Sequence, residues 1–350
     1  MRSAAPLGTK EWQHLLRYDE WAYSVAPLVL AAPLYYLCTQ PPDVIRAQET
    51  FVGLAGFAVF LFMLLGFGYA VNDYSDIEVD KAAGKDKLIS RLPRQKSVSI
   101  LATLVVVGVL ATALAPHHKL VSMLVAVGAY ILGAAHSLPF FRAKERGVLG
   151  PIVSSFAQRG TPVIVAGVMF SMDSQFTAAW VLLSFLNGLR YIFIHQLLDE
   201  ENDRVGNVRT FVTDNGAKVT RRLIVVVFVV ELVLLIPVMA PSLAHSANVW
   251  VYALFGGYAA LGITVTLIYV RVFGKSDLLF TYDLVPFEVF LNYVLPAAAL
   301  ILLTEQDYYY LLILILFSIC MFPMIRSKLY ALRGFMDLVR GRHVQLPLED

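Results

Sequence analysis

The sequence predicts an all-α, polytopic membrane protein, and three observations lead to this fold class. Hydrophobic residues make up 58% of the 350 residues, charged residues make up 15%, and the mean hydropathy is +0.67. Soluble domains carry more charge and less apolar surface. Apolar segments close to the ~20 residues that cross a bilayer as a helix recur along the whole chain. The hydrophilic stretches between them are too short for an independent core.

Ten apolar segments are predicted to cross the membrane. They are Ala22–Thr39, Phe51–Val71, Val98–Leu114, Leu120–Ala135, Leu149–Phe170, Phe176–Leu198, Leu223–Met239, Val249–Val270, Leu284–Leu303 and Tyr308–Ile325. The ninth segment contains Pro286 and Pro296, so it is expected to be kinked or partly re-entrant. Residues 1–350 are therefore predicted to form a single integral membrane domain. It consists of an N-terminal cytoplasmic segment (1–21), a transmembrane bundle (22–325) and a basic C-terminal tail (326–350).

The distribution of lysine and arginine predicts the orientation of the chain. Alternate loops on one side contain Lys81, Lys85, Lys87, Arg91, Arg94, Lys96, Arg142, Lys144, Arg146, Arg204, Arg209, Lys218, Arg221 and Arg222. The loops on the other side contain little beyond Arg46 and Lys119. Basic loops stay in the cytoplasm, which predicts a multi-pass protein with these loops on the cytoplasmic side. The net charge of +2 gives no reason to expect nucleic acid as a partner.

The first polar cluster follows the second apolar segment directly. Residues 72–80 (NDYSDIEVD) contain four acidic residues and an asparagine. If the preceding helix continues through them, the four-residue spacing places Asn72, Asp76 and Asp80 on one face. Oxygen-bearing side chains on one stripe suit a hard cation. The alternative is an ordinary solvated helix end, but negative charge is unfavourable at a helix C-terminus.

A second polar cluster follows the sixth apolar segment, on the same predicted side of the membrane. Asp199 and Asp203 repeat the four-residue spacing within residues 199–207 (DEENDRVGN). Two carboxylate stripes, each at the end of an even-numbered span, indicate an internal duplication. Together they are suited to divalent cations that also bind a substrate diphosphate. The predicted metal ligands are Asn72, Asp73, Asp76, Asp80, Asp199 and Asp203, of which Asp76, Asp80, Asp199 and Asp203 are the predicted catalytic residues.

Basic residues on the same side are predicted to bind the outer oxygens of that diphosphate. The candidates are Lys87, Arg91, Arg142, Lys144 and Arg204, and for each the alternative is a role in topology or lipid-headgroup contact. Charged and polar side chains within spans usually face a cavity or a partner. On this ground Arg159, Asn187, His195 and Asn292 are predicted to line a cavity. Glu231 has no assignable partner in the sequence and is left out of the site.

These motifs carry a family resemblance. The pattern Asn72-Asp73-x-x-Asp76-x-x-x-Asp80 resembles the first Asp-rich motif of the UbiA superfamily of intramembrane prenyltransferases. The pattern His195-Gln196-x-x-Asp199-x-x-x-Asp203-x-x-Gly206 resembles the second, and Ser137-x-Pro139-x-x-Arg142-x-Lys144 is similar to the loop between them. Their order and their spacing across spans are also those of the family. The resemblance implies an all-helical bundle of nine or ten transmembrane helices around a central cavity that opens laterally to lipid.

The resemblance also implies an activity. The expected reaction is the Mg²⁺-dependent transfer of an isoprenoid chain from a prenyl diphosphate to a small acceptor within the lipid bilayer, with an aromatic or quinone-like compound as one candidate. Residues 87–93 (KLISRLP) depart from the Arg-Pro and Ser-Gly elements of members that prenylate aromatic acids, so the acceptor stays open. A membrane terpene cyclase that uses no second substrate is the alternative enzyme. A transporter is the alternative outside catalysis, but its acidic residues would lie near mid-span.

Overall fold

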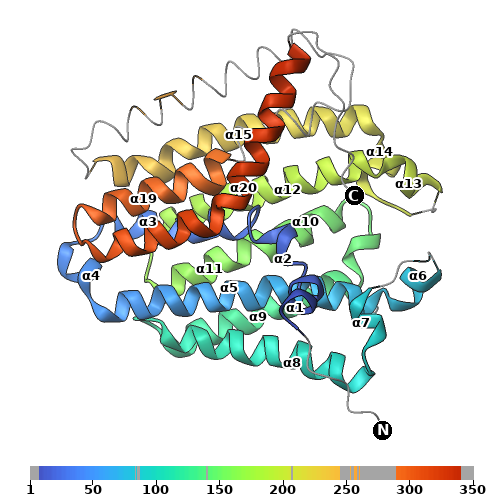
Figure 1. Ribbon diagram of the computed structural model, residues 1–350, viewed down its shortest axis with the longest axis horizontal. Helices are drawn as coiled ribbons and strands as arrows, with labels where there is room; N and C mark the ends of the chain where they lie inside the picture. The colour runs from blue at the N-terminus through green and yellow to red at the C-terminus, as the bar shows by residue number, and fades with distance from the viewer. Residues whose placement is uncertain are drawn as a thin grey trace. The chain divides into compact units, whose positions relative to one another are not determined.

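The computed structural model of the chain describes residues 8–82, 84, 87–138, 141–205, 208–244, 253, 256–257, 260 and 289–339. These residues form helices and turns, with no β-strand among them (Figure 1). The all-helical fold class is thus confirmed for the described part of the chain. Contacts divide the protein into two compact units. Unit 1 comprises Met1–Tyr36 and Arg46–Met239, and unit 2 comprises Leu37–Ile45 and Ala240–Asp350.

Six helices in the described residues are long and apolar enough to cross a membrane. They are Gln48–Ser75, Arg94–Leu114, Lys119–Ser137, Ser174–Leu198, Ala217–Pro241 and Tyr309–Ser327, and each coincides with a predicted segment. The first and ninth predicted segments contain shorter apolar helices, Ala26–Leu37 and Phe290–Thr304. The eighth segment, Val249–Val270, lies almost entirely outside the described residues. The number of nine or ten spans therefore stays a prediction.

Unit 1 begins with short helices that pack on a long one. Helices α1 (Thr9–Leu15) and α2 (Tyr18–Trp21) precede α3 (Ala26–Leu37) and α4 (Pro42–Arg46), which reach into unit 2. Leu16 packs closely on helix α5 (Gln48–Ser75) at Gly66, where a Cβ atom would lie 3.1 Å from the Leu16 side chain. The Trp21 indole donates a hydrogen bond of 2.8 Å to the carbonyl of Leu16. The Trp21 ring also lies edge-on against Phe62 of α5, with ring centroids 5.1 Å apart, so the N-terminal segment packs on α5.

Helix α5 is surrounded by the next two membrane helices. It packs against α8 (Arg94–Ala111), η1 (Thr112–Leu114) and α9 (Lys119–Ser137). Two short helices, α6 (Ile77–Ala82) and α7 (Leu88–Arg91), connect α5 to α8 along the chain. These helices approach one another closely at glycine residues, which have no side chain. A Cβ at Gly56 would lie 2.6 Å from the Ala111 carbonyl, and one at Gly108 would overlap the Tyr130 hydroxyl at 1.9 Å.

The second half of unit 1 is built around helix α12 (Ser174–Leu198). It packs against α10 (Leu149–Ser155), the π-helix η3 (Phe156–Gly160) and α11 (Thr161–Met169), which together form the fifth predicted segment. It also contacts the later helices α13 (Glu200–Val205) and α14 (Phe211–Asn215), and an ion pair from Arg190 joins it to Glu231 of α15 (Ala217–Ala244). The short helix η2 (Ala143–Glu145) precedes α10 and packs on it. Helix α12 begins where the Asp173 carboxylate caps the backbone N–H groups of Gln175 and Phe176, at 2.8 and 3.0 Å. A side-chain oxygen at this position satisfies donors that the helix itself cannot.

The described part of unit 2 contains the π-helix η4 (Phe290–Val294), α19 (Leu295–Thr304) and α20 (Tyr309–Val339). Pro296 occupies the start of α19, where proline needs no backbone N–H. The Tyr310 hydroxyl donates a hydrogen bond of 3.0 Å to the carbonyl of Ile45. Helix α20 continues into the predicted basic tail as far as Val339, and residues 340–350 lie outside the described residues.

Candidate functional site

The first Asp-rich motif lies at a break between two helices. Helix α5 ends at Ser75, Asp76 has φ −102° and ψ 7°, and α6 starts at Ile77. The helix is therefore interrupted at Asp76, and the condition of one continuous helix through the motif is not met. The break has a physical reason, since Glu78 and Asp80 then lie in the first turn of α6, where the helix dipole favours negative charge. The backbone N–H groups of Asp76 and Asp80 still bond to the carbonyls four residues earlier, at 3.1 and 2.7 Å.

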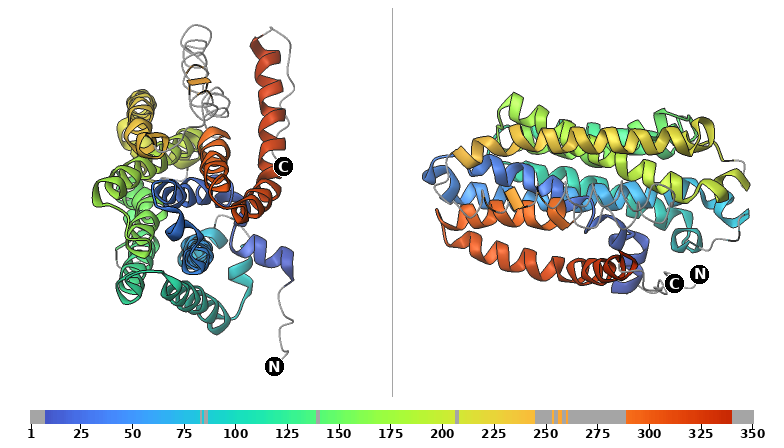
Figure 2. Two further views of the ribbon diagram at one scale, coloured as in Figure 1. Left: turned by 90° about the vertical axis from the view of Figure 1, so that its left-hand side faces the viewer. Right: turned by 90° about the horizontal axis from the view of Figure 1, so that it is seen from above.

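The second motif repeats this local structure. Helix α12 ends at Leu198, Asp199 has φ −92° and ψ 0°, and α13 places Asp203 in its first turn. The backbone N–H groups of Asp199 and Asp203 also bond four residues back, at 3.0 and 2.8 Å. Figure 1 and the right-hand view of Figure 2 place α6 and α13 at the same end of unit 1. The duplicated spacing in the sequence thus corresponds to a duplicated helix–break–helix structure.

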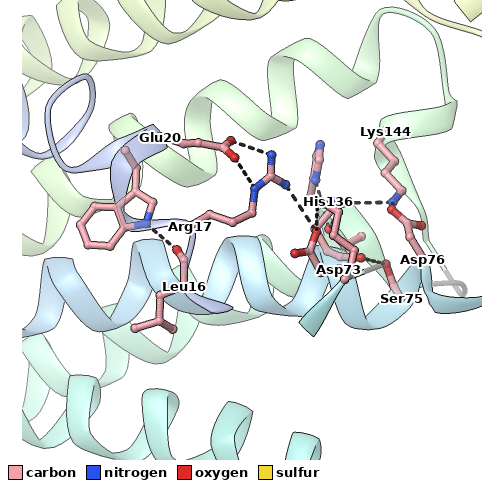
Figure 3. A network of polar contacts seen from close by, with 12 residues as sticks. Leu16, Arg17, Glu20, Asp73, Ser75, Asp76, His136 and Lys144 are labelled. Carbon is pink, nitrogen blue, oxygen red and sulfur yellow. Dashed lines mark hydrogen bonds and ion pairs between the residues drawn. The ribbon is translucent and has the colours of Figure 1, made fainter. Parts of the chain in front are cut away.

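The side chains of the first motif are bound by the basic loop that follows α9 (Figure 3). Lys144 donates to Asn72 Oδ1 at 3.0 Å and forms a short ion pair with Asp76 Oδ2. Arg142 donates to Asp76 Oδ1 at 3.3 Å, and Ser137 donates to Asn72 Oδ1 at 3.2 Å. The structure therefore brings together four predicted site residues from two of the three sequence motifs, the first Asp-rich motif and the intervening loop, together with Ser137 of that loop motif.

The position of the Lys144 ammonium tests whether the first motif suits a divalent cation. One amide oxygen, from Asn72, and one carboxylate oxygen, from Asp76, converge on this single positive group. Mg²⁺ is commonly bound by one or two carboxylates together with substrate phosphates, so this donor set fits such an ion. Among the residues that the structure describes, no group of three or more His, Cys, Asp or Glu side chains is placed to hold a metal ion. A joint metal site with the second motif stays a prediction.

Asp73 points to a different set of partners. Its Oδ1 accepts a hydrogen bond of 3.4 Å from Arg17 and lies 3.8 Å from Lys87 Nζ. Arg17 also donates to both carboxylate oxygens of Glu20, at 2.5 and 2.6 Å, and lies over the Tyr69 ring. Although burial opposes the Arg17 charge, the hydrogen bonds with Glu20 and the attraction of Glu20 and Asp73 raise its pKa above the ordinary value.

The sequence did not indicate Arg17. It lies 56 residues before Asp73 in a polar, mixed-charge segment that resembles an ordinary topology-determining terminus. The one local signal is its backbone, with φ 49° and ψ 44°, which becomes visible only in the structure. A non-glycine residue in this left-handed region is uncommon and is held there by its surroundings.

Two cavities meet at Arg17. A cavity of ≈150 Å³ is lined by Arg17, Leu64, Leu65, Gly68, Tyr69, Asn72, Gly133, His136, Ser154, Ala157 and Gln158. A second cavity of ≈130 Å³ is lined by Gln13, His14, Leu15, Arg17, Asp19, Glu20, Asp73, Lys87, Leu88 and Ile89. Adjacent residues of the motif, Asn72 and Asp73, therefore face different spaces. The first cavity has a mostly apolar lining surface with several polar side chains, whereas the second is lined by many charged side chains.

Other predicted site residues lie in the two motifs or on the elements that follow them, at the same end of unit 1 (Figure 1). Asp80 and Asp203 are half-buried, whereas His195 and Asp199 are exposed. Arg91 is the last residue of α7. Arg204 is 61% exposed in its side chain and pairs with Glu200 at 2.8 Å. Their roles in binding metal or diphosphate stay predictions.

The polar residues within the spans form a buried network. Arg159 in η3 donates a short hydrogen bond to Asn187 Oδ1 and lies over the Tyr191 ring. Arg190 donates to both carboxylate oxygens of Glu231 on α15, at 2.7 and 3.0 Å, and both side chains are fully buried. Asn187 lies 3.4 Å from Glu231 Oε2. Glu231, which the sequence left without a partner, therefore belongs to this network.

Asn292 lies in unit 2, in η4, where it is 2% exposed. Its predicted role in lining the cavity stays a prediction, because the residues of the two cavities described above all belong to unit 1. Two residues of the sequence motifs lie outside the described residues, namely Gly206 at the end of the second motif and Pro139 in the intervening loop.

Comparison with known proteins identifies the family. Residues 24–280 match the family model of the UbiA prenyltransferase family, so the chain belongs to that family. It is an integral membrane protein and a prenyltransferase. A search of curated proteins found no significant match.

Solved structures share the fold. One is described as a digeranylgeranylglyceryl phosphate synthase in membranes, with a TM-score of 0.60, 15% identity, and coverage of 85% of this chain and 98% of that chain. A UbiA homolog from Archaeoglobus fulgidus bound to DMAPP and Mg²⁺ has a TM-score of 0.56, and its complex with GPP and Mg²⁺ has 0.55. Each of these two is 15% identical and covers 84% of this chain and 99% of that chain. At this identity the likeness concerns the fold.

Proposed function

We propose that the protein transfers an isoprenoid chain from a prenyl diphosphate to a small acceptor within the membrane, in a reaction that requires Mg²⁺. The observation that carries this proposal is the convergence of Asn72, Asp76, Arg142 and Lys144 at the end of a membrane helix. Acidic and basic groups at one point suit a ligand that is a metal–diphosphate complex, because the acids bind the ion and the bases bind the phosphate oxygens. An adjoining apolar cavity suits an isoprenoid tail.

The relatives support the same substrate class. The Archaeoglobus fulgidus homolog has been solved with GPP and Mg²⁺ and with DMAPP and Mg²⁺, and also with Cd²⁺. In the proposed site, Asn72, Asp73, Asp76, Asp80, Asp199 and Asp203 hold Mg²⁺, and Lys87, Arg91, Arg142, Lys144 and Arg204 hold the diphosphate. Bound Mg²⁺ supplies charge neutralisation that makes the diphosphate a better leaving group. The basic side chains stabilise the charge that develops on it.

The proposal includes the orientation and the extent of the bundle. The site faces the cytoplasm because the surrounding loops are basic. A bundle of nine or ten membrane helices encloses the central cavity, in a single membrane domain that includes the described and the remaining residues. An aromatic or quinone-like compound is the proposed acceptor class.

Diphosphate release by the purified protein tests the proposal. Wild type supplied with a prenyl diphosphate, Mg²⁺ and a set of aromatic and quinone acceptors should release diphosphate, and it should lose this activity when EDTA removes the ion. Asp76→Asn and Asp199→Asn should each reduce the rate by about 100-fold or more, because each removes a charge on which the metal depends. The matched controls are Glu78→Gln and Glu201→Gln, two exposed acids beside the same motifs. Wild-type rates in both Asp variants would contradict the assignment.

Product analysis separates transfer from cyclisation. A prenyltransferase gives a prenylated adduct only when an acceptor is added. A terpene cyclase of this fold would give the same hydrocarbon or alcohol with and without the acceptor. Mass spectrometry of the products from graded prenyl diphosphates, with and without aromatic and quinone acceptors, therefore decides between the two.

A further inference from the structure

One face of α5 leads from the motif into the larger cavity. The residues of α5 that line it are Leu64, Leu65, Gly68, Tyr69 and Asn72, a spacing that keeps them on one side of the helix. Gly68 lies four positions before Asn72, which corresponds to about 6 Å along the helix axis. This distance is comparable with the length of one isoprene unit. A chain whose diphosphate is bound through Mg²⁺ at Asn72 and Asp76 would therefore pass Gly68 early on its way into the cavity.

Helix α9 forms the opposite wall at the same depth. Ser137 donates to Asn72 Oδ1, which fixes the two helices relative to each other at this level. Both helices end at this side of unit 1, so they run in parallel (Figure 1). Gly133 lies four positions before Ser137, as Gly68 lies four positions before Asn72. Both glycines line the same cavity.

The space beside Gly68 is not used for helix packing. A Cβ at Gly53, Gly56 or Gly66 of the same helix would meet Pro116 at 2.6 Å, the Ala111 carbonyl at 2.6 Å or Leu16 at 3.1 Å. A Cβ at Gly68 would meet no atom within 4 Å outside its own helix. The first three glycines thus allow neighbouring elements to approach α5, whereas Gly68 leaves open space.

We propose that Gly68, together with Gly133, determines which prenyl chains the protein accepts, by keeping the passage from the diphosphate site into the apolar cavity open. This inference rests on the proposed function and deepens it. A larger side chain at Gly68 would occupy the passage at the first isoprene unit. The loss of affinity should therefore grow with chain length, because each additional isoprene unit would lose its apolar contacts in the cavity.

Dissociation constants test this inference without the need for an acceptor. The probes are dimethylallyl, geranyl and geranylgeranyl diphosphates, each with Mg²⁺, on full-length protein in detergent. We expect Gly68→Leu to lower the affinity ratio of the longest to the shortest chain by about tenfold or more. Gly68→Ala and Gly133→Ala should change the ratio in the same direction by less. The control is Gly128→Leu, since Gly128 on α9 is exposed and a Cβ there meets nothing within 4 Å.

The outcomes are distinct. An unchanged ratio in folded Gly68→Leu overturns the inference, and so does an equal loss of affinity for all chain lengths, which would indicate damage to the diphosphate site. If Gly68→Leu cannot be purified, Gly68→Ala takes its place, because a methyl group at this position meets no neighbouring atom and the variant should fold. An unchanged affinity ratio in Gly68→Ala would then overturn the inference. Wild type that binds none of the three probes contradicts the proposed function itself.

Discussion

At the scale of single residues, the site depends on charges that compensate one another. Asp76 lies between Arg142 and Lys144, and Asp73 lies between Arg17 and Lys87. Like-charged carboxylates three residues apart would repel each other without these partners. Under the proposed function, the same basic groups bind phosphate oxygens once Mg²⁺ is bound to the carboxylates. The loop after α9 therefore serves both states of the site under the proposed function.

Lys144 provides a direct test of this exchange. Lys144→Gln removes one positive charge from the proposed diphosphate site and keeps a side chain of similar length. We expect the dissociation constant of geranyl diphosphate with Mg²⁺ to rise by about tenfold or more, because hydrogen bonds to charged groups contribute about 1.5–3 kcal/mol. Lys119→Gln is the control, since Lys119 is exposed at the start of α9. Equal affinity in wild type and Lys144→Gln would exclude Lys144 from the site.

The buried pair of Arg190 and Glu231 gives a prediction about stability. Both side chains are 0% exposed, so Glu231→Gln leaves a buried arginine without its counter-charge. We expect a loss of about 3 kcal/mol in the free energy of unfolding. The control is Glu200→Gln, whose partner Arg204 is 61% exposed, and which should cost less than about 1 kcal/mol. Chemical unfolding in detergent measures both, and equal stabilities of the two variants would contradict the prediction.

At the scale of elements, the sequence predicted where helices lie better than where they end. Six apolar segments became long helices because backbone hydrogen bonds must be satisfied within a span. The breaks at Asp76 and Asp199 were not predicted, because a four-residue spacing is compatible with both a continuous and an interrupted helix. The deciding factor is electrostatic, since a new helix start stabilises the acids that follow.

Contacts between distant elements were also beyond the sequence. Arg17 approaches Asp73 because α1 and α2 pack on α5, and Glu231 meets Arg190 because α15 lies beside α12 at that position. No local pattern encodes either pairing, since each depends on how two helices pack. In contrast, the sequence predicted the grouping of Asn72, Asp76, Arg142 and Lys144. The first motif lies at the end of one span and the basic loop follows another span, and both were predicted on the same side of the membrane.

At the scale of the whole molecule, the arrangement of the spans places both motifs at one end of unit 1 (Figure 1). Helices α5 and α12 end at the same end of unit 1 (Figures 1 and 2). Under the proposed function, a site at the ends of these helices keeps the diphosphate near water while its apolar chain enters the bilayer. The positions of the basic loops predict which side this is, because lysine and arginine are retained in the cytoplasm.

Single cysteines test the orientation. In a background with Cys38→Ala and Cys320→Ala, we would introduce Glu78→Cys and Glu201→Cys beside the two motifs, and Lys119→Cys and Ser174→Cys at the starts of α9 and α12. All four positions are exposed. A membrane-impermeant thiol reagent applied to intact cells should label the second pair and should label the first pair only after permeabilisation. Labelling of Glu78→Cys and Glu201→Cys in intact cells would place the site outside. Labelling of only one of them would contradict the shared side, on which the proposed joint site for metal and diphosphate depends.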